Sequence, residues 1–299
     1  RRSTGSAGAR PASGSQRVVV ANPCVAHAIT DAAASETDVE AWALRYITSE
    51  RLVDKLDPPA PPLHFSGRAT AVPEGPGRPP ELRITQHAPR RKGLTNPRAR
   101  AELLHTFLHH ELQAAELMCW AILRFADAPV ELRRGLLGIC LDEVRHMKLY
   151  AGHIEALGAS VGEFPVRDWF WERVPRATTP AAFVAFMGMG LEAGNLEHAG
   201  RFAARFRDVG DEAGAVLQER VGAEEVAHVR FAVRWFETFT GTSDFESWRR
   251  HLPPPISPVL LRGLPLDRIR RKRAGMDDAF LDALECFEAT LEPPGGAGG

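Results

Sequence analysis

The feature that most restricts how this chain can fold is a Glu-x-x-His string that occurs twice inside long helical patterns. The two strings are Glu143-Val-Arg-His146 and Glu225-Val-Ala-His228. Residues three apart lie on one face of a helix, so each string can direct a carboxylate and an imidazole toward one point. Apolar residues at three- and four-residue spacings surround both strings, which predicts that both pairs face the interior of a helical protein.

A single glutamate precedes each string at nearly the same distance. Glu111 lies 32 residues before Glu143, and Glu192 lies 33 residues before Glu225. Each of these two glutamates shares a helix face with apolar residues, at the spacing expected for the buried side of a helix. A buried carboxylate is costly unless a cation or hydrogen bonds compensate its charge. The sequence therefore contains two matched halves, each presenting a glutamate and a Glu-x-x-His pair.

Together the two halves supply four carboxylates and two imidazoles, the ligand set of di-iron and di-manganese carboxylate bundles. Oxygen donors with two imidazoles suit iron or manganese, whereas structural zinc sites favour thiolates. We predict a site for two Fe ions, with a Mn/Fe pair or two Mn ions as the alternative. The predicted metal ligands are Glu111, Glu143, His146, Glu192, Glu225 and His228. The competing interpretation is that these six are salt-bridged core residues without a metal.

Helix start and stop signals place these residues on four long helices of similar length. Asn96-Pro97 and Thr179-Pro180 each combine a capping residue with a proline suited to the first turn, and Gly158 is suited to a helix end. The predicted helices span residues 96–125, 129–158, 179–208 and 211–239. Short turns make two antiparallel hairpins, and the connection over 159–178 is long enough to cross over the bundle. The predicted fold class is all-α, a four-helix bundle with a crossover connection.

The sequence on either side of these helices is predicted to extend the bundle. The predicted organisation is a disordered segment over 1–16, an N-terminal helix and proline-rich wrap over 17–95, the bundle over 96–240 and a helical C-terminal extension over 241–299. Residues 36–56 are predicted to form one helix, and residues 276–291 a last amphipathic helix. Proline and glycine are frequent over 58–80, which favours an extended segment.

Charge and composition argue against several classes of protein. The formal net charge is −1, so nucleic acid and anionic membranes are not expected as partners. No stretch of about 18 apolar residues occurs, so we expect no membrane-spanning helix. The four cysteines, Cys24, Cys119, Cys140 and Cys286, are scattered without a C-x-x-C pair. This pattern is typical of a reducing compartment, and we predict a cytoplasmic protein in which Cys119 and Cys140 are buried side chains.

Two sets of strings resemble known families. Asp142-Glu143-Val144-Arg145-His146 resembles the D-E-x-R-H signature of bacterial multicomponent monooxygenases and related di-iron proteins. The matching string Glu224-Glu225-Val226-Ala227-His228 departs from it, because glutamate replaces the leading aspartate and alanine replaces the arginine. More closely, residues 36–291 resemble a bacterial ferritin-like family of unknown function. That resemblance is carried by H-H-E-L-Q-A-A-E-L from residue 109, L-D-E-V-R-H from 141, L-E-A-G-N-L-E-H-A from 191 and A-E-E-V-A-H-V-R-F from 223.

The resemblance implies a ferritin-like fold of the di-iron carboxylate superfamily and a metal site, and it implies no substrate. It also implies that Glu143 and Glu225 are the two carboxylates that bridge the ions. By analogy, Asp142 and Glu224 would accept hydrogen bonds from the N–H groups of the ligand histidines. The alternative for these two acids is a solvated charge on a helix surface.

Further polar residues near the predicted ligands have roles that the sequence leaves open. Glu197 and His198 follow Glu192 and are predicted to form a hydrogen-bonded network around the site, with an extra metal ligand as the alternative. Tyr150 lies two turns from Glu143 and is either a redox-active or gating catalytic phenol or, as favoured, a core tyrosine with a satisfied hydroxyl. A cluster on another side of the first helix is predicted to make interhelical polar contacts: His105, His109 and Glu116.

The predicted metal site points to oxygen chemistry. The leading hypothesis is an oxidoreductase, an O2-activating di-iron oxidase or hydroxylase acting on an unidentified small organic molecule, with an electron donor as a further partner. Such an enzyme is expected to be a monomer or a homodimer. The alternatives are a ferroxidase or iron-handling protein, an RNA-modifying hydroxylase and a non-catalytic scaffold.

Overall fold

The computed structural model describes residues 37–68, 70–87 and 93–288 of the chain. Within these ranges the structure is helical, and extended backbone pairs only at one isolated bridge, between Ile84 and Val166. The predicted all-α fold class is therefore confirmed. The segment predicted to be disordered, 1–16, lies outside the described residues.

Helices α3 (Pro97–Arg124) and α4 (Val130–Ala156) form the first hairpin. The side chain of Asn96 accepts a hydrogen bond from the backbone N–H of Arg98 and so caps the first turn of α3. Gly158 has a φ of 79°, a left-handed conformation that glycine adopts readily, and α4 ends just before it. Both helices lie close to their predicted bounds, because local capping residues determine where they begin and end.

The third long helix is continuous but not uniform. It begins as α5 (Pro180–Phe183), widens into the π-helical segment η2 (Val184–Glu192) and continues as α6 (Ala193–Asp208). Its extent agrees with the predicted helix over 179–208, whereas the π-helical segment was not predicted. Such segments are rare and are frequent at functional sites, and this one ends at Glu192.

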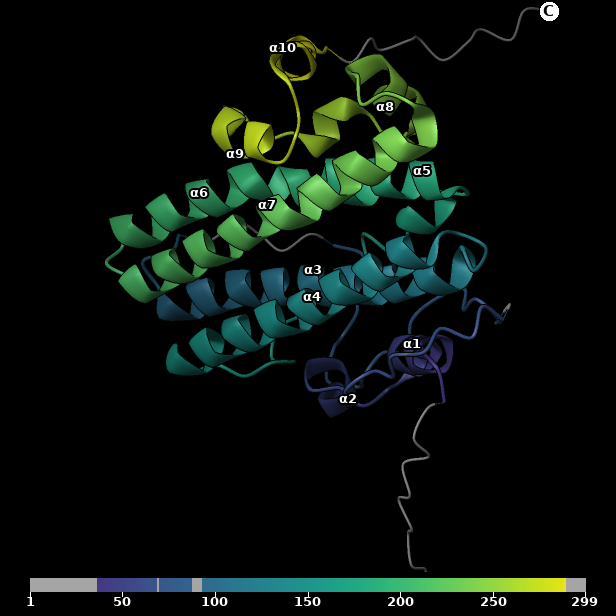
Figure 1. The fold of residues 1–299 in the computed structure, drawn as a ribbon. Coiled ribbons are helices and arrows are strands. Elements are labelled where there is room, and N and C mark those ends of the chain that lie inside the picture. Colours follow the sequence, from purple (N-terminus) through teal and green to yellow (C-terminus); the bar gives the residue numbers. More distant parts are fainter. Residues whose placement is uncertain (1–36, 69, 88–92, 289–299) are drawn as a thin grey trace, which may run out of the picture. The chain divides into compact units, whose positions relative to one another are not determined.

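Helix α7 (Glu212–Thr240) completes the set of four, and its N-terminus is capped by the side chain of Asp211. The α3–α4 hairpin packs against the pair formed by η2–α6 and α7, with α4 facing α7 (Figure 1). The four long helices therefore lie alongside one another and enclose a common interior between the two hairpins. No helix in the described ranges is both long enough and apolar enough to cross a membrane.

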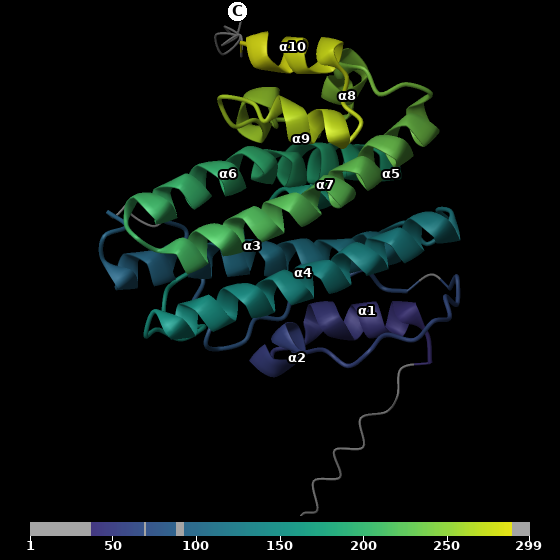
Figure 2. The ribbon, with the colours of Figure 1, turned by 60° about the vertical axis from the view of Figure 1, so that its left-hand side comes forward.

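The flanking segments pack on opposite sides of these four helices (Figures 1 and 2). Helices α1 (Val39–Thr48) and α2 (Leu52–Leu56) contact α3 and α4. On the other side, the first three C-terminal elements contact η2, α6 or α7, and the last one packs on the first. They are α8 (Phe245–His251), the 3-10 turn η3 (Pro258–Leu261), α9 (Arg268–Arg273) and α10 (Asp278–Cys286). The last of these is shorter than the predicted helix over 276–291, part of which lies outside the described residues.

The predicted single helix over 36–56 is wrong, because the structure divides it into α1 and α2 at Ser49. The backbone of Ser49 is extended, with φ −62° and ψ 134°. The ammonium group of the buried residue Lys55 donates hydrogen bonds to the carbonyl oxygens of Tyr46 and Ile47, at 2.6 and 2.7 Å. These bonds satisfy the end of α1 and require the chain to turn back.

A buried ion-pair network attaches the N-terminal segment and the crossover connection to α3. At its centre is Glu116, whose carboxylate lies 2.8 Å from Lys55 Nζ and 2.7 Å from an Arg78 nitrogen. Trp171 of the crossover donates its indole N–H to the same carboxylate at 2.8 Å. Glu116 and Lys55 are both fully buried, so each depends on its partners for compensation.

The other two members of the predicted polar cluster also contact the crossover connection. His109 Nε2 lies 2.9 Å from a carboxylate oxygen of Asp168, and His105 Nε2 accepts a hydrogen bond from the backbone N–H of Gly162 at 2.7 Å. The prediction of polar contacts is therefore correct for His105, His109 and Glu116. The predicted interhelical contact is found for Glu116, which pairs with Lys55 of α2, whereas His105 and His109 contact the crossover connection instead.

Gly188 of η2 allows the backbones of η2 and α7 to approach closely. A Cβ atom at this position would lie 2.2 Å from the Cβ of Ala232, whereas a Cβ at Gly138 of α4 would meet no atom within 4 Å. We expect Gly188→Ala to lower the free energy of unfolding by about 1–3 kcal/mol through overpacking. The matched change Gly138→Ala is expected to raise it by about 0.5–1 kcal/mol, since alanine is the better helix former. Urea unfolding of both variants checks this, and equal midpoints would contradict it.

Candidate metal centre

The six predicted ligands come from all four long helices and lie in two overlapping groups. One group is formed by Glu111, Glu143, His146 and Glu225, and the other by Glu143, Glu192, Glu225 and His228. Within each group, one oxygen or ring nitrogen of every residue lies within 4.8 Å of those of the others. Glu143 and Glu225 belong to both groups, so the structure brings all six predicted residues together.

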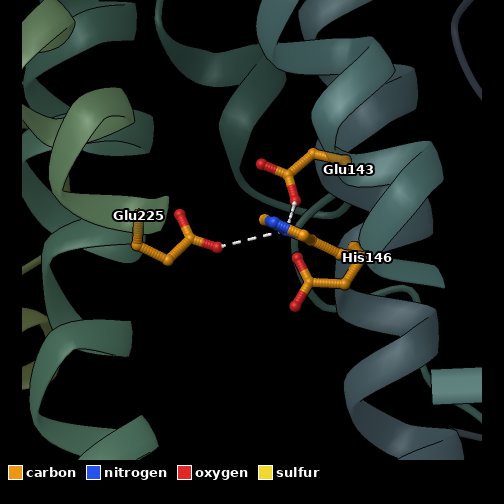
Figure 3. A group of neighbouring side chains, drawn as sticks. Glu143, His146 and Glu225 are labelled. Carbon is orange, nitrogen blue, oxygen red and sulfur yellow. Dashed lines mark hydrogen bonds and ion pairs between the residues drawn. The ribbon is translucent and has the colours of Figure 1, made fainter. Parts of the chain in front are cut away.

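The Nδ1 atoms of both histidines lie against the shared carboxylates. His146 Nδ1 is 3.0 Å from Glu143 Oε2 and 3.6 Å from Glu225 Oε1, and Figure 3 shows these three side chains converging from α4 and α7. His228 Nδ1 is 3.0 Å from Glu225 Oε2 and 3.0 Å from Glu143 Oε1. Each imidazole therefore contacts one carboxylate of its own helix and one of the helix opposite.

The buried charged groups of the cluster lie close together and shift one another's pKa values. Burial raises the pKa of Glu111 well above its usual range, and the carboxylates of Glu143 and Glu225 raise it further. Burial also acts to raise the pKa of Glu143, but His228 and His146 outweigh it and hold this pKa below its usual range. The pKa of His146, which burial alone would lower, is raised by Glu143 and Glu225 to about 9. Without a cation, protons must offset part of the negative charge.

Among the clustered residues, Glu192 most clearly lacks a partner that compensates the charge of its carboxylate. Both of its carboxylate oxygens are buried and accept no hydrogen bond from the described residues, and the same holds for Glu225 Oε1. Burial, followed by the charges of Glu225 and Glu143, raises the pKa of Glu192 well above its usual range. Buried polar atoms in native proteins nearly always have partners, so these oxygens indicate a missing positive group. Carboxylate and imidazole donors fit iron or manganese.

Two acids outside the groups contact the two histidines, and each acid contacts the histidine of the opposite helix. Asp142 of α4 lies 3.2 Å from His228 Nε2 on α7, and Glu224 of α7 lies 2.8 Å from His146 Nε2 on α4. The hydrogen bond from His228 is the largest cause that lowers the pKa of Asp142, to about 2. With one proton held at Nε2 by an acid, Nδ1 is the ring atom that faces the cluster and would bind a metal in place of its own proton. Both acids thus have the contacts that the resemblance implied.

Arg145 joins these two acids and was not identified as a functional residue from the sequence. Its guanidinium donates to Asp142 at 2.7 Å and to Glu224 at 2.5 Å. Arg145 occupies the arginine position of the D-E-x-R-H string, and Ala227 occupies the corresponding position in the other half. One arginine therefore contacts both acids, although Ala227 replaces the arginine of the other half.

The predictions for Glu197 and His198 are wrong. The carboxylate of Glu197 accepts hydrogen bonds from Arg271 at 2.7 and 2.8 Å and from the backbone N–H groups of Gly263 and Asp267. Five residues along an α-helix correspond to a rotation of about 140°, so Glu197 points away from the face of Glu192. His198 is exposed at the surface. Glu197 instead attaches the C-terminal extension to α6.

Tyr150 lies beside the cluster in a buried position. Its hydroxyl accepts a hydrogen bond from Gln218 Nε2 at 3.3 Å, and its ring packs against Phe107. Burial raises the pKa of Tyr150 well above its usual value, and the charges of Glu111 and Glu225 raise it further. The partner of the hydroxyl fits the favoured interpretation of a core tyrosine, and a catalytic role stays a prediction.

A small cavity adjoins the cluster and could not be identified from the sequence. Glu192 and His228 form one side of it, and apolar side chains form the rest, among them Met118, Phe183 and Phe231. Its volume is about 10 Å³, close to the smallest space that holds one water molecule. The π-helical segment η2 contributes Val184, Gly188 and Glu192 to its wall.

Comparison with known proteins identifies the family of the chain. No curated protein and no solved structure matches the sequence. The protein family of unknown function DUF455 matches residues 28–282, which include all four long helices and the six clustered residues. The chain therefore belongs to the DUF455 family.

Proposed function

We propose that this chain is a ferritin-like protein that binds two iron ions and acts as an O2-activating oxidase or hydroxylase of a small organic molecule. The observation that carries the proposal is the pair of buried groups that share Glu143 and Glu225. Two separate metal sites would need separate ligands, whereas two ions bridged by carboxylates would use shared ones. The oxygens of Glu192 that lack hydrogen bonds support the same proposal.

The grouping suggests a role for each ligand. Glu111 and His146 would bind one ion, and Glu192 and His228 would bind the other. Glu143 and Glu225 would bridge the two ions because both belong to each group. Zinc is disfavoured, since no thiolate of the described cysteines is among the grouped donors.

Two ferrous ions, when bound, supply electrons for the reduction of O2. The protein's own residues prepare the site. Glu143, His146 and Glu225 are fully buried, which excludes bulk water from the reacting centre. Asp142 and Glu224 hold protons at the Nε2 atoms of His228 and His146, so both rings keep one orientation.

Iron handling is the second candidate, and the cavity argues against it. A ferroxidase must admit Fe²⁺ as its substrate, and a route for a cation is expected to carry acidic side chains. The cavity beside Glu192 and His228 is otherwise lined by apolar residues. Apolar walls and a volume of about 10 Å³ favour O2 over a hydrated cation.

The test is metal analysis of the protein purified without oxygen, followed by Mössbauer spectroscopy before and after O2 is added. The expected result is about two ferrous ions per chain, as in other bundles with this ligand set, and oxidation of both by O2. Iron that is bound but not oxidised would support a non-catalytic scaffold instead. Product analysis with candidate organic molecules would then separate an oxidase or hydroxylase from a ferroxidase.

A further inference from the structure

Two of the described cysteines form a buried pair between α3 and α4. The Sγ atoms of Cys119 on α3 and Cys140 on α4 lie 3.5 Å apart, within the range of a weak S–H hydrogen bond. Both side chains are fully buried, as the sequence predicted, whereas Cys286 is exposed on α10. The interior therefore contains two thiols in contact with each other, and the proposed metal centre uses neither of them.

The thiol pair lies between the proposed metal ligands and the ion-pair network of Glu116. Cys140 precedes Glu143 by three residues, which is about 4.5 Å along the axis of α4. Burial raises the pKa of the Cys140 thiol well above its usual value, and the contact with Cys119 and the carboxylates of Glu143 and Glu116 raise it further. Cys140 thus keeps its proton at neutral pH and lies within one helical turn of a proposed bridging ligand.

A disulfide bond between these two cysteines requires only a small movement. The bond is about 2.0 Å long, so the two sulfur atoms have to approach by about 1.5 Å. This is less than the distance by which a cysteine sulfur moves from one staggered rotamer to the next. The two residues are 21 positions apart on helices that already form one hairpin, so the bond would link neighbours in the existing fold.

The burial of the pair restricts which oxidant can reach it. A bulky, charged oxidant such as oxidised glutathione has no access to two fully buried sulfur atoms. Hydrogen peroxide is small and uncharged, and it is the product when O2 takes up two electrons. Two ferrous ions would supply two electrons, so the proposed metal centre is a source of hydrogen peroxide within one helical turn of Cys140.

We infer that Cys119 and Cys140 form a modification site at which hydrogen peroxide produces a reversible disulfide bond between α3 and α4. One thiol attacks the peroxide, its sulfur keeps one oxygen as a sulfenic acid, and the other oxygen leaves as water. The second thiol attacks this sulfur, the S–S bond forms, and the hydroxyl group leaves with the remaining thiol proton as a second water. Two electrons pass from the two thiols to the peroxide.

The disulfide would consume peroxide that is released beside the ligands when O2 is reduced without an organic substrate. This source of the peroxide rests on the proposed function. The modification itself requires neither iron nor O2, because added hydrogen peroxide is sufficient for it.

The test treats the metal-free full-length chain with hydrogen peroxide, digests it with trypsin and identifies the peptides by mass spectrometry without a reductant. Trypsin cleaves after Arg124 and Arg133, so the two cysteines fall on different peptides unless a disulfide joins them. Peroxide is expected to join these peptides and dithiothreitol to separate them. Oxidised glutathione is expected to modify the exposed Cys286 and leave the pair reduced. Separate peptides after a treatment that has oxidised Cys286 would overturn the inference.

Two variants show whether the cross-link forms in the folded protein. Cys119→Ala is expected to abolish it and to leave Cys140 as a sulfenic acid, which dimedone traps. Cys286→Ala is the matched control and is expected to retain the cross-link, because Cys286 lies on the exposed surface of α10. Circular dichroism shows that the variants are folded. A cross-link from Cys140 to another cysteine in the folded Cys119→Ala protein would overturn the pairing.

A second measurement tests the metal centre as the source of the peroxide. Iron-loaded protein exposed to O2 without an organic substrate is expected to form the same cross-link. Catalase, which is too large to enter the interior, is expected not to prevent it. Absence of the cross-link in iron-loaded protein, when peroxide forms it in metal-free protein, would overturn this source. Failure to bind iron would count against the proposed function and leave the result with metal-free protein standing.

Discussion

Glu143→Ala is expected to retain almost no iron, whereas Glu111→Ala is expected to retain about one ion per chain, half of the proposed pair. Glu143 belongs to both ligand groups, and Glu111 belongs to one. Removal of a shared carboxylate leaves each group with three residues and also removes the group that would neutralise the charge between the ions. Removal of Glu111 leaves the group of Glu143, Glu192, Glu225 and His228 complete.

Metal analysis of the purified variants measures this difference, and circular dichroism shows whether the helices are retained. Glu237→Ala is the matched control, since Glu237 is an exposed glutamate on α7 away from the clustered residues. It is expected to bind as much iron as the unaltered chain. Equal iron content in the Glu143→Ala and Glu111→Ala proteins would show that the two groups do not share Glu143.

Glu116→Ala is expected to lower the free energy of unfolding by about 3–5 kcal/mol. Glu116 is fully buried against the equally buried Lys55 and against Arg78, and its removal leaves positive charge in the interior without a partner. The same carboxylate accepts the indole N–H of Trp171, so the crossover connection also loses a contact. Urea unfolding followed by tryptophan fluorescence measures the loss. Glu131→Ala, at an exposed position of α4, is expected to stay within about 0.5 kcal/mol of the unaltered chain.

The stabilisation that Glu116 contributes to the folded state is expected to decrease as the pH falls. Burial acts to raise the pKa of Glu116, but Arg78 and Lys55 outweigh it, so the pKa lies below its usual value of 4.5. A carboxyl group with a lowered pKa stabilises the folded state above its unfolded pKa, and this contribution is lost as the pH falls through the folded pKa. The difference between the unaltered chain and Glu116→Ala should therefore be full at pH 7 and shrink below pH 4.5. A difference that grows on acidification would contradict the assignment.

The parts of the structure that depend on local sequence could be predicted. Asn96 and Gly158 define the bounds of two helices through capping, which involves only nearby residues. The inward direction of Glu143 and His146 follows from helical spacing alone. The convergence of all six residues could be predicted because two hairpins with matched spacing leave few ways of burying their charges.

Features that depend on distant contacts could not be predicted. Glu197 follows a predicted ligand closely in sequence, but its partner Arg271 is 74 residues away, so proximity along the chain was misleading. The break between α1 and α2 depends on where Lys55 finds its partners, and one of these, Glu116, lies on a helix that begins 42 residues after Lys55. The close approach of Gly188 to Ala232 joins segments that lie far apart in the chain, and no periodicity reveals that distance.

The pairing of Glu197 with Arg271 has a consequence for efforts to shorten the protein. A version trimmed to the four long helices would lose Arg271 together with the backbone donors of Gly263 and Asp267. Glu197 would then remain on α6 without the four hydrogen bonds that now compensate its charge. A minimal version would thus need a replacement at Glu197 before its iron content and stability could be compared with those of the whole protein.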